Sequence, residues 1–181
     1  MQGSAAPLPA RQVPTLETER LRLRAHRADD FDACLATWSD PEVTRYIGGR
    51  PFTGEEVWDR LLRYAGSWSL LGYGYWAVEE KDSGRYIGDV GFADLKRDIE
   101  PSLHGMLEFG WVLAPHAHGK GYASEVVTAV TAWGQAHVGD HRAVCIISPN
   151  NLASIRVAEK AGFRRWQETI YHGNPTLVFT R

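Results

Sequence analysis

The stretch PHAHGKGYASE, residues 115–125, places two glycines directly in front of a run with helical periodicity. Residues 106–113 before it alternate as a strand does, and the apolar residues after it repeat at intervals of three and four. These apolar positions, which share one helix face, are Ala123, Val126, Val127, Val130 and Trp133. Glycines at the mouth of a helix let successive main-chain N–H groups point outward, where the helix dipole adds positive potential. The turn therefore predicts a cradle for a diphosphate group.

The two glycines also fit other turns. Gly119 and Gly121 suit a tight strand-to-helix connection without any ligand, so a second observation is needed. A nucleotide P-loop requires Gly-Lys followed by Ser or Thr, whereas here a second glycine follows the lysine. A dinucleotide fingerprint is closer, because Ser124 completes the glycine spacing and Asp140 lies about 20 residues on. In that fold, however, the acid ends a parallel strand, and Asp140 precedes the expected strand 142–147, so dinucleotide binding is the weaker alternative.

Outside the glycine turn, short β-rich runs alternate with amphipathic helices. A Thr53 N-cap predicts a helix that ends near Gly72. Asp29 and Asp30 are expected to cap a shorter helix that ends at Trp38. The other expected elements are a turn at 40–41, strands at 16–24, 75–79, 85–92, 106–113, 142–147, 165–171 and 176–180, and a helix at 151–161 closed by Gly162. The fold class is α/β, with a single mixed and mostly antiparallel sheet.

The composition limits the class of protein. With 181 residues and 44% apolar content, the chain suits one domain, which we place at residues 15–181 behind a flexible tail of residues 1–14. A formal charge of -2 and the lack of a basic stripe argue against nucleic acid as a partner. No apolar run is long enough for a signal peptide or a membrane span, so a cytoplasmic protein is expected. Cys34 and Cys145 are too few for a disulfide framework and are expected to be buried thiols.

Three blocks of the sequence carry a family resemblance: LETERLRLR at residues 16–24, residues 108–125, and NLASIRVAEKAGF at residues 151–163. Together they make the chain resemble the GNAT-fold N-acetyltransferases and, more narrowly, their ribosomal-protein N-terminal acetyltransferase branch. The resemblance covers residues 16–180 and implies a GNAT fold whose sheet splays open between flanking helices. It also implies acetyl-CoA as co-substrate and a primary amine as acceptor, on a protein N-terminus or a small molecule. Formation of a homodimer is left open.

The resemblance also assigns residues to the cofactor. The family's turn has Gln or Arg, two residues, Gly, one residue, then Gly or Ala, which corresponds to His118, Gly121 and Ala123. His118 departs from the usual first residue, and Lys120 is expected to supply the missing positive charge. The other turn residues expected at the diphosphate are Gly119, Tyr122 and Ser124. The residues expected along the pantetheine arm are Trp111, Val112 and Leu113 on one side and Asn151 and Ser154 on the other.

Transfer from a thioester to an amine requires a neutral amine, a site for the developing oxyanion and a proton for the thiolate. Glu108, on the strand that leads into the glycine turn, is the expected proton acceptor, with His104 as a weaker candidate. Glu108 also fits an ordinary exposed charge on an alternating strand. The resemblance makes Ser154 the proton donor, with Tyr171 or Tyr122 behind it, although Ser154 also fits a helix cap. Neither cysteine has the paired histidine of a nucleophile, so transfer is expected to be direct.

The acceptor is not identified by the sequence. It is expected to contact the first two helices and residues 96–105, and loops of this kind vary independently of the fold. The aromatic candidates for a pocket wall, most of which fall on apolar core faces, are Trp38, Tyr46, Trp58, Trp68, Tyr73 and Trp76. The closest histidine pairs lack a third ligand, so no metal is expected. A catalytically silent acyl-CoA-binding or sensor domain and a structural interaction module stay as alternatives.

Overall fold

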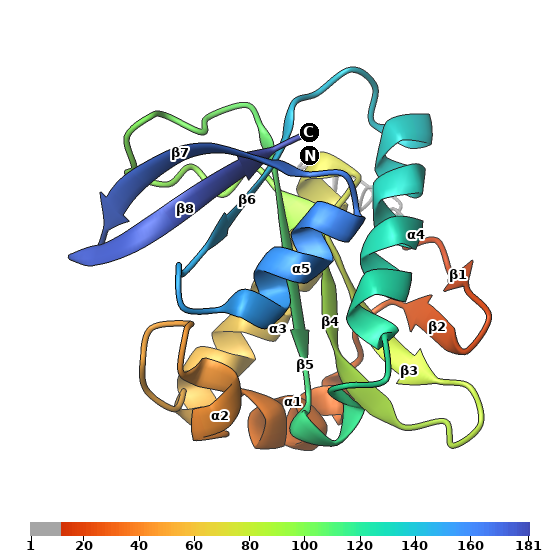
Figure 1. The fold of residues 1–181 in the computed structure, drawn as a ribbon. Helices are drawn as coiled ribbons and strands as arrows, with labels where there is room; N and C mark the ends of the chain where they lie inside the picture. The colour runs from red at the N-terminus through yellow and green to blue at the C-terminus, as the bar shows by residue number, and fades with distance from the viewer. Residues whose placement is uncertain (1–11) are drawn as a thin grey trace, which may run out of the picture.

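The computed structural model describes residues 12–181 and contains one mixed sheet with the strand order β1-β2-β3-β4-β5-β6-β8-β7 (Figure 1). The strands are β1 (Leu16–Glu17), β2 (Leu21–Arg24), β3 (Tyr75–Glu80), β4 (Tyr86–Ala93), β5 (Leu107–Leu113), β6 (Ala143–Ile147), β7 (Arg164–Tyr171) and β8 (Asn174–Thr180). The helices are α1 (Phe31–Trp38), α2 (Pro41–Thr44), α3 (Gly54–Leu71), α4 (Tyr122–His137) and α5 (Leu152–Lys160). Neighbouring strands pair antiparallel, except that β5 and β6 run parallel. The mixed, mostly antiparallel sheet predicted from the sequence is confirmed.

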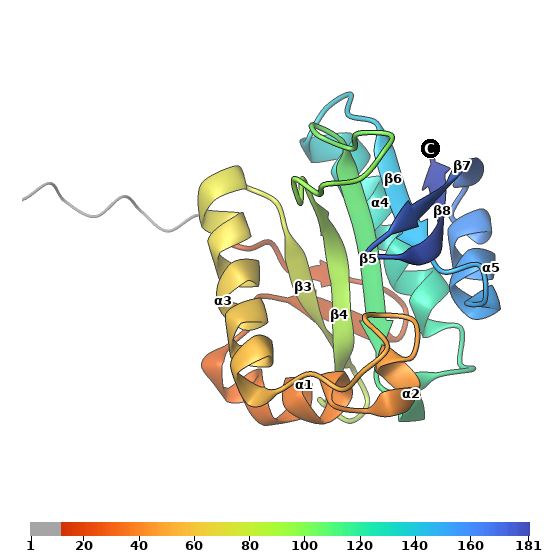
Figure 2. The same cartoon turned by 90° about the vertical axis from the view of Figure 1, so that its left-hand side faces the viewer.

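The helices cover the sheet from both faces. On one face α1 and α3 pack together against β4 and β3, and on the other α4 packs on β4 and β5 beside α5 (Figure 2). The larger core cluster includes the fully buried Val126, Val127 and Val130 of α4. A smaller cluster lies among α1, α3 and the sheet and contains Cys34, Trp38, Val57 and Leu61. The three valines are the residues whose spacing predicts the helix, so burial of one face explains that periodicity.

α3 begins and ends where the sequence predicts. The Glu56 N–H donates to Thr53 Oγ1 at 3.3 Å, and the Thr53 N–H donates to Glu56 Oε2 at 2.9 Å, which completes a capping box. Gly72 follows the helix in the left-handed conformation, with φ 78°, which glycine adopts without steric cost. Because both ends are fixed, the inward side chains of α3 have a defined place over the sheet.

Two elements near the N-terminus differ from the expectations. Asp40 and Pro41 begin the short helix α2 and not a simple turn, because the Asp40 carboxylate accepts the Glu42 N–H at 2.7 Å and Pro41 has no N–H to satisfy. The expected strand 16–24 is interrupted at residues 18–20, with a bend at 19–20, and forms β1 and β2, which pair with each other.

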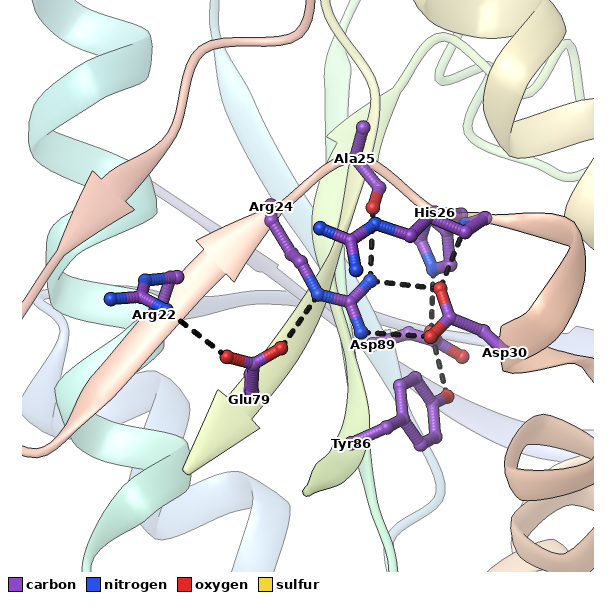
Figure 3. A network of polar contacts seen from close by, with 9 residues as sticks. Arg22, Arg24, Ala25, His26, Asp30, Glu79, Tyr86 and Asp89 are labelled. Atoms are coloured by element: carbon purple, nitrogen blue, oxygen red, sulfur yellow. Dashed lines mark hydrogen bonds and ion pairs between the residues drawn. The ribbon is translucent and has the colours of Figure 1, made fainter. Parts of the chain in front are cut away.

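Asp30 occupies the N-cap position of α1, but its carboxylate makes no cap hydrogen bond to α1 and lies in a buried polar network (Figure 3). Arg24 donates Nη1 to Oδ2 and Nη2 to Oδ1, both at 2.8 Å, and the Arg27 N–H donates to Oδ2 at 2.8 Å. Glu79 accepts a hydrogen bond from Nε of the same guanidinium at 2.8 Å. The expected cap is therefore right in position for Asp30 and wrong for its side chain, because Arg24 and the Arg27 N–H take the carboxylate. Asp29 lies within the 3₁₀ turn Ala28–Asp30 and does not cap α1.

Most of the expected flexible tail, residues 1–14, lies outside the described residues, which begin at 12. Within the described part, Val13 packs against the larger core cluster, and the Pro14 carbonyl accepts a hydrogen bond from Trp76 Nε1 at 2.7 Å. The contacts of the domain therefore extend at least to Val13. Between residues 12 and 181, none of the helices has the length and hydrophobicity of a membrane span.

Candidate active site

A gap in the sheet opens where β5 and β6 separate after two residue pairs. The Leu107 N–H donates to the Arg142 carbonyl at 3.0 Å, and main-chain groups that face the same edge of a strand recur at every second residue. Trp111 and Leu113 therefore turn their main-chain groups toward the gap. An open edge of this kind accepts an extended ligand as an added strand.

The glycine turn lies at the end of β5. Gly119 and Gly121 have φ values of 73° and 80°, in the left-handed region that favours glycine. No side chain caps α4, and its first main-chain bond runs from the Glu125 N–H to the Gly121 carbonyl at 3.2 Å. The three N–H groups between these two residues thus have no acceptor in the helix. A Cβ on Gly119 would meet nothing within 4 Å, so the turn has room for a diphosphate at the positive end of the helix.

A cavity of about 370 Å³ joins the gap to the glycine turn. Its wall contains every residue predicted to bind the cofactor except Lys120, namely Trp111, Val112, Leu113, His118, Gly119, Gly121, Tyr122, Ala123, Ser124, Asn151 and Ser154. Another part of the wall comes from α2 and the residues around it: Glu42, Val43, Arg45, Tyr46 and Ile47. Of these only Tyr46 is predicted from the sequence, since a four-residue helix is too short to show an amphipathic pattern.

The other aromatic candidates do not line this cavity. Trp38, Trp68 and Trp76 are buried in the core, as expected for residues on apolar faces. Trp58 is 40% exposed on the outer side of α3. The sequence therefore predicts the burial of these side chains better than it predicts which of them reaches a ligand.

His118 and Lys120 both turn away from the glycine turn. His118 Nε2 donates to the Leu113 carbonyl at 2.8 Å, and its Nδ1 lies 3.8 Å from a Glu42 carboxylate oxygen. Lys120 Nζ lies 3.7 Å from Glu80 Oε1. In this arrangement Lys120 faces Glu80 and not the cavity, so its contact with a phosphate stays a prediction.

Arg20 is the cation that lies against the glycine turn. Its Nη2 is 3.5 Å from the place where a Cβ on Gly121 would stand, and its Nη1 donates to the Lys120 carbonyl at 2.8 Å. Glu125 orients the guanidinium by accepting from Nε at 2.8 Å. Arg20 was not predicted, because its contact with the turn joins residues 100 positions apart and no local pattern reports it.

Asn151 and Ser154 form the start of α5 on the cavity wall. Asn151 Oδ1 accepts the Ser154 N–H at 3.1 Å, so Asn151 is the N-cap and Ser154 is not. Within residues 12–181 the Ser154 hydroxyl makes no hydrogen bond, which leaves it free for the predicted role of proton donor. The Tyr122 hydroxyl instead donates to Glu80 Oε1 at 2.7 Å, and this bond raises the pKa of Tyr122.

Glu108 is buried and held by Arg97, which excludes the exposed position that an alternating strand allows. Arg97 Nε lies 2.9 and 2.6 Å from the two carboxylate oxygens, and Nη2 donates to Oε1 at 2.7 Å. The Tyr171 hydroxyl accepts from Nη1 of the same guanidinium at 3.1 Å. Arg97 belongs to the loop between β4 and β5, and the structure thus brings two of the predicted catalytic residues, Glu108 and Tyr171, together on one arginine. His104 of the same loop is exposed and bonds the Arg97 carbonyl at 3.2 Å.

Both cysteines are buried thiols, as the sequence predicts. Burial raises the pKa of Cys34 to about 12, and it also raises the pKa of Cys145. Neither thiol is therefore ionised near neutral pH, as a nucleophile must be. In the described part of the chain, no three His, Cys, Asp or Glu side chains gather closely enough to hold a metal ion.

Known proteins resemble this chain in fold and in sequence. The family model "Acetyltransferase (GNAT) domain" matches residues 20–164. An uncharacterized N-acetyltransferase, p20 of Bacillus licheniformis, is 31% identical over 154 residues, which cover 84% of each chain. The crystal structure of an acetyltransferase from Agrobacterium tumefaciens is 28% identical, with a TM-score of 0.80 over 94% of this chain and 95% of that chain. Aminoglycoside acetyltransferase AAC(6')-Ib, solved with coenzyme A, shares the fold with a TM-score of 0.72 and 20% identity over 89% of this chain and 94% of that chain.

Proposed function

The chain belongs to the GNAT family of acetyltransferases, and we propose that it transfers an acetyl group directly from acetyl-CoA to a primary amine. Its enzyme class is N-acetyltransferase, the name its relatives carry. Within the family we assign it to the ribosomal-protein N-terminal acetyltransferase branch, because its three sequence blocks resemble that branch. The acceptor in this proposal is a primary amine on a protein N-terminus or a small molecule.

The observation that carries the proposal is an uncapped helix start and an open strand edge along one cavity. Three free N–H groups at the positive end of α4 suit the diphosphate of acetyl-CoA, and Arg20, paired with Glu125, lies beside the turn. On the open edge of β5, the main-chain groups of Trp111 and the N–H of Leu113 suit the amides of a pantetheine arm, while the Leu113 carbonyl is bonded by His118. When bound, acetyl-CoA supplies an acetyl thioester whose carbonyl carbon an amine attacks.

Glu108 is the proposed proton acceptor for the attacking amine. A carboxylate has about four lone-pair sites, and the three contacts with Arg97 leave one of them for the amine proton or for a bridging water. The free Ser154 hydroxyl on the cavity wall is the proposed donor of a proton to the leaving sulfur, with Tyr171 as the second candidate. An amide bond forms, the carbon–sulfur bond breaks and one proton moves from nitrogen to sulfur through these groups.

Titration calorimetry tests the proposal. We expect acetyl-CoA to bind to the wild-type protein and NAD not to bind. Gly121→Trp should abolish acetyl-CoA binding, because its side chain would fill the turn and meet Arg20. Gly173→Trp is the matched control, since Gly173 also has a positive φ, 77°, but lies in the β7–β8 turn with open space around it. NAD binding, or no acetyl-CoA binding by the wild type, would contradict the proposal.

A further inference from the structure

Arg60, on the inner side of α3, carries a positive charge that no carboxylate neutralises in the described part of the chain. Its guanidinium carbon lies 3.8 Å from the centre of the Trp38 ring and 4.9 Å from that of Phe52. Nη1 donates to the Tyr64 hydroxyl at 3.3 Å, while Nε is buried and has no acceptor within residues 12–181. Nη2 also makes no hydrogen bond there, and it is not buried. The two rings fix the position of the guanidinium, and its accessible Nη2 group has no hydrogen-bond acceptor among the described residues.

A neighbouring arginine shows the contrast. Arg50 lies 5.9 Å over the same Phe52 ring, but its guanidinium is satisfied by Glu56, which accepts from Nη1 at 2.9 Å and from Nη2 at 2.5 Å. Arg60 also lies against Phe52, but no carboxylate of the described residues pairs with it. Because unbonded buried donors reduce stability, a fixed arginine of this kind is typical of a site whose acceptor is not part of the protein.

Stacked rings connect Arg60 to the strand that lines the proposed reaction site. Tyr64 stacks on Tyr75 with ring centres 4.6 Å apart and an angle of 17° between the planes. Tyr75 Oη stands 2.6 Å from the place where a Cβ on Gly110 would be, so it lies over the middle of β5. Gly110 follows Glu108 by two residues and therefore shares its face of the sheet. Within residues 12–181 the Tyr75 hydroxyl makes no hydrogen bond.

The same region borders the cavity. Trp38 and Phe52, whose rings both contact Arg60, pack in one core cluster with Ile47 and Val112. Ile47 and Val112 both line the cavity. Arg60 therefore contacts side chains that pack against two residues of the cavity wall.

The charges on this face favour an anion. Glu108 is already bound by Arg97. Buried Asp89 accepts from His26 at 2.7 Å and from Trp38 and Tyr86, each at 2.8 Å. A carboxylate would meet the guanidinium of Arg60 here, for which the described residues supply no acid.

From these contacts we infer that Arg60 binds a carboxylate of the acceptor, so that the acceptor is an amine that also carries a carboxylate, as an amino acid does. The Tyr75 hydroxyl, which itself lies over Gly110, hydrogen-bonds the amine-bearing end on the face of β5 that carries Glu108. This inference rests on the proposed acetyl transfer and adds a class of acceptor to it.

A panel of free amino acids, each paired with its C-terminal amide, tests the inference. The amide keeps the amine and the side chain and removes only the negative charge. With saturating acetyl-CoA, release of the CoA thiol gives kcat/KM for each pair. For the preferred side chain we expect the acid to exceed the amide by at least about tenfold, the scale of one charge-assisted contact. Calorimetry with the N-acetylated products should show the same preference in binding without turnover.

Two variants locate the preference. Arg60→Met keeps a long apolar side chain against the two rings and should reduce the acid-to-amide ratio to about one, because the charge-assisted contact is lost. Arg50→Met, which removes the arginine already paired with Glu56, should leave the ratio unchanged. An unchanged ratio in Arg60→Met, equal use of acids and amides by the wild type, or turnover confined to peptides or aminoglycosides would overturn the inference. If one of these results is found and the wild type still binds acetyl-CoA, only the inference about the acceptor is rejected. If the wild type does not bind acetyl-CoA, the proposed function is rejected as well.

Discussion

The guanidinium of Arg97 binds both carboxylate oxygens of Glu108, with a shortest contact of 2.6 Å. The same guanidinium donates to the Tyr171 hydroxyl at 3.1 Å. One residue of the loop between β4 and β5 therefore orients side chains from β5 and β7. Since this loop is expected to contact the acceptor, the position of the loop and the orientation of the proposed proton acceptor are coupled.

Replacing Glu108 with Gln should lower kcat by about a hundredfold or more, the usual cost of losing a general base. Gln keeps the shape of the side chain, so acetyl-CoA affinity should not change. The loss should shrink as the pH rises, because a larger fraction of the acceptor amine is then neutral without help. Thiol release measured from pH 7 to 10 checks this. Wild-type kcat in Glu108→Gln would show that another group takes the proton.

His118→Arg should increase acetyl-CoA affinity. It would place a cation where the family's turn has Gln or Arg and would remove the bond from His118 to the Leu113 carbonyl. One charge-assisted phosphate contact should lower Kd by roughly tenfold in dilute buffer, and the gain should shrink in 0.5 M salt, where screening is strong. His116→Arg, two residues earlier and outside the cavity wall, is the control. Equal affinity of wild type and His118→Arg at low salt would contradict the expectation.

The parts of the fold that could be predicted are those with a local cause. The capping box at Thr53 and the buried valine face of α4 are encoded within one or two helical turns, so the sequence shows them directly. α2 was missed because four residues carry no periodicity. The Asp30 side chain was wrongly predicted to bond the start of α1, because its actual partner, Arg24, lies on a strand whose position relative to α1 is set by tertiary packing.

The candidate site likewise has a part that the sequence predicts and a part that only the structure shows. The glycine turn and β5 are adjacent in the sequence, and the cavity contains nearly all the residues predicted from them. The contacts that set the charge of the site are long-range: Arg97 meets Tyr171 across 74 positions, and Arg20 meets Glu125 across 105. No pattern in the sequence reports such pairs. The surroundings of the proposed catalytic groups therefore required the structure.

The Asp30 carboxylate should make stability depend on acid pH. Burial alone would raise its pKa, but the bonds from Arg24 and the Arg27 N–H outweigh burial, so the pKa lies below its ordinary value. A lowered folded-state pKa stabilises the fold above the unfolded pKa of about 4, and this contribution is lost as the pH falls below it. Asp30→Asn should cost about 3 kcal/mol at pH 7, because it leaves a buried guanidinium short of one acid.

Urea unfolding from pH 3 to 7 measures this dependence. The free energy of unfolding of Asp30→Asn should fall less steeply below pH 4 than that of the wild type. Glu17→Gln, which breaks an exposed pair with Arg22, is the control and should change the stability little, because solvent screens such pairs. Parallel pH curves for the wild type and Asp30→Asn would show that Asp30 does not contribute to acid sensitivity.

Gly66→Ala and Gly110→Ala should change stability in opposite directions. Gly66 lies inside α3, and an added Cβ would meet nothing within 4 Å, so alanine should stabilise the protein by about 1 kcal/mol through helix propensity alone. At Gly110 the same Cβ would stand 2.6 Å from Tyr75 Oη, and the stack on Tyr64 prevents that ring from yielding cheaply. Gly110→Ala should therefore cost about 1–3 kcal/mol, the usual effect of overpacking, and should lower kcat/KM for the acceptor because the tyrosine hydroxyl is displaced. Urea unfolding and thiol release check both variants, and unchanged stability in Gly110→Ala would mean that Tyr75 is free to move.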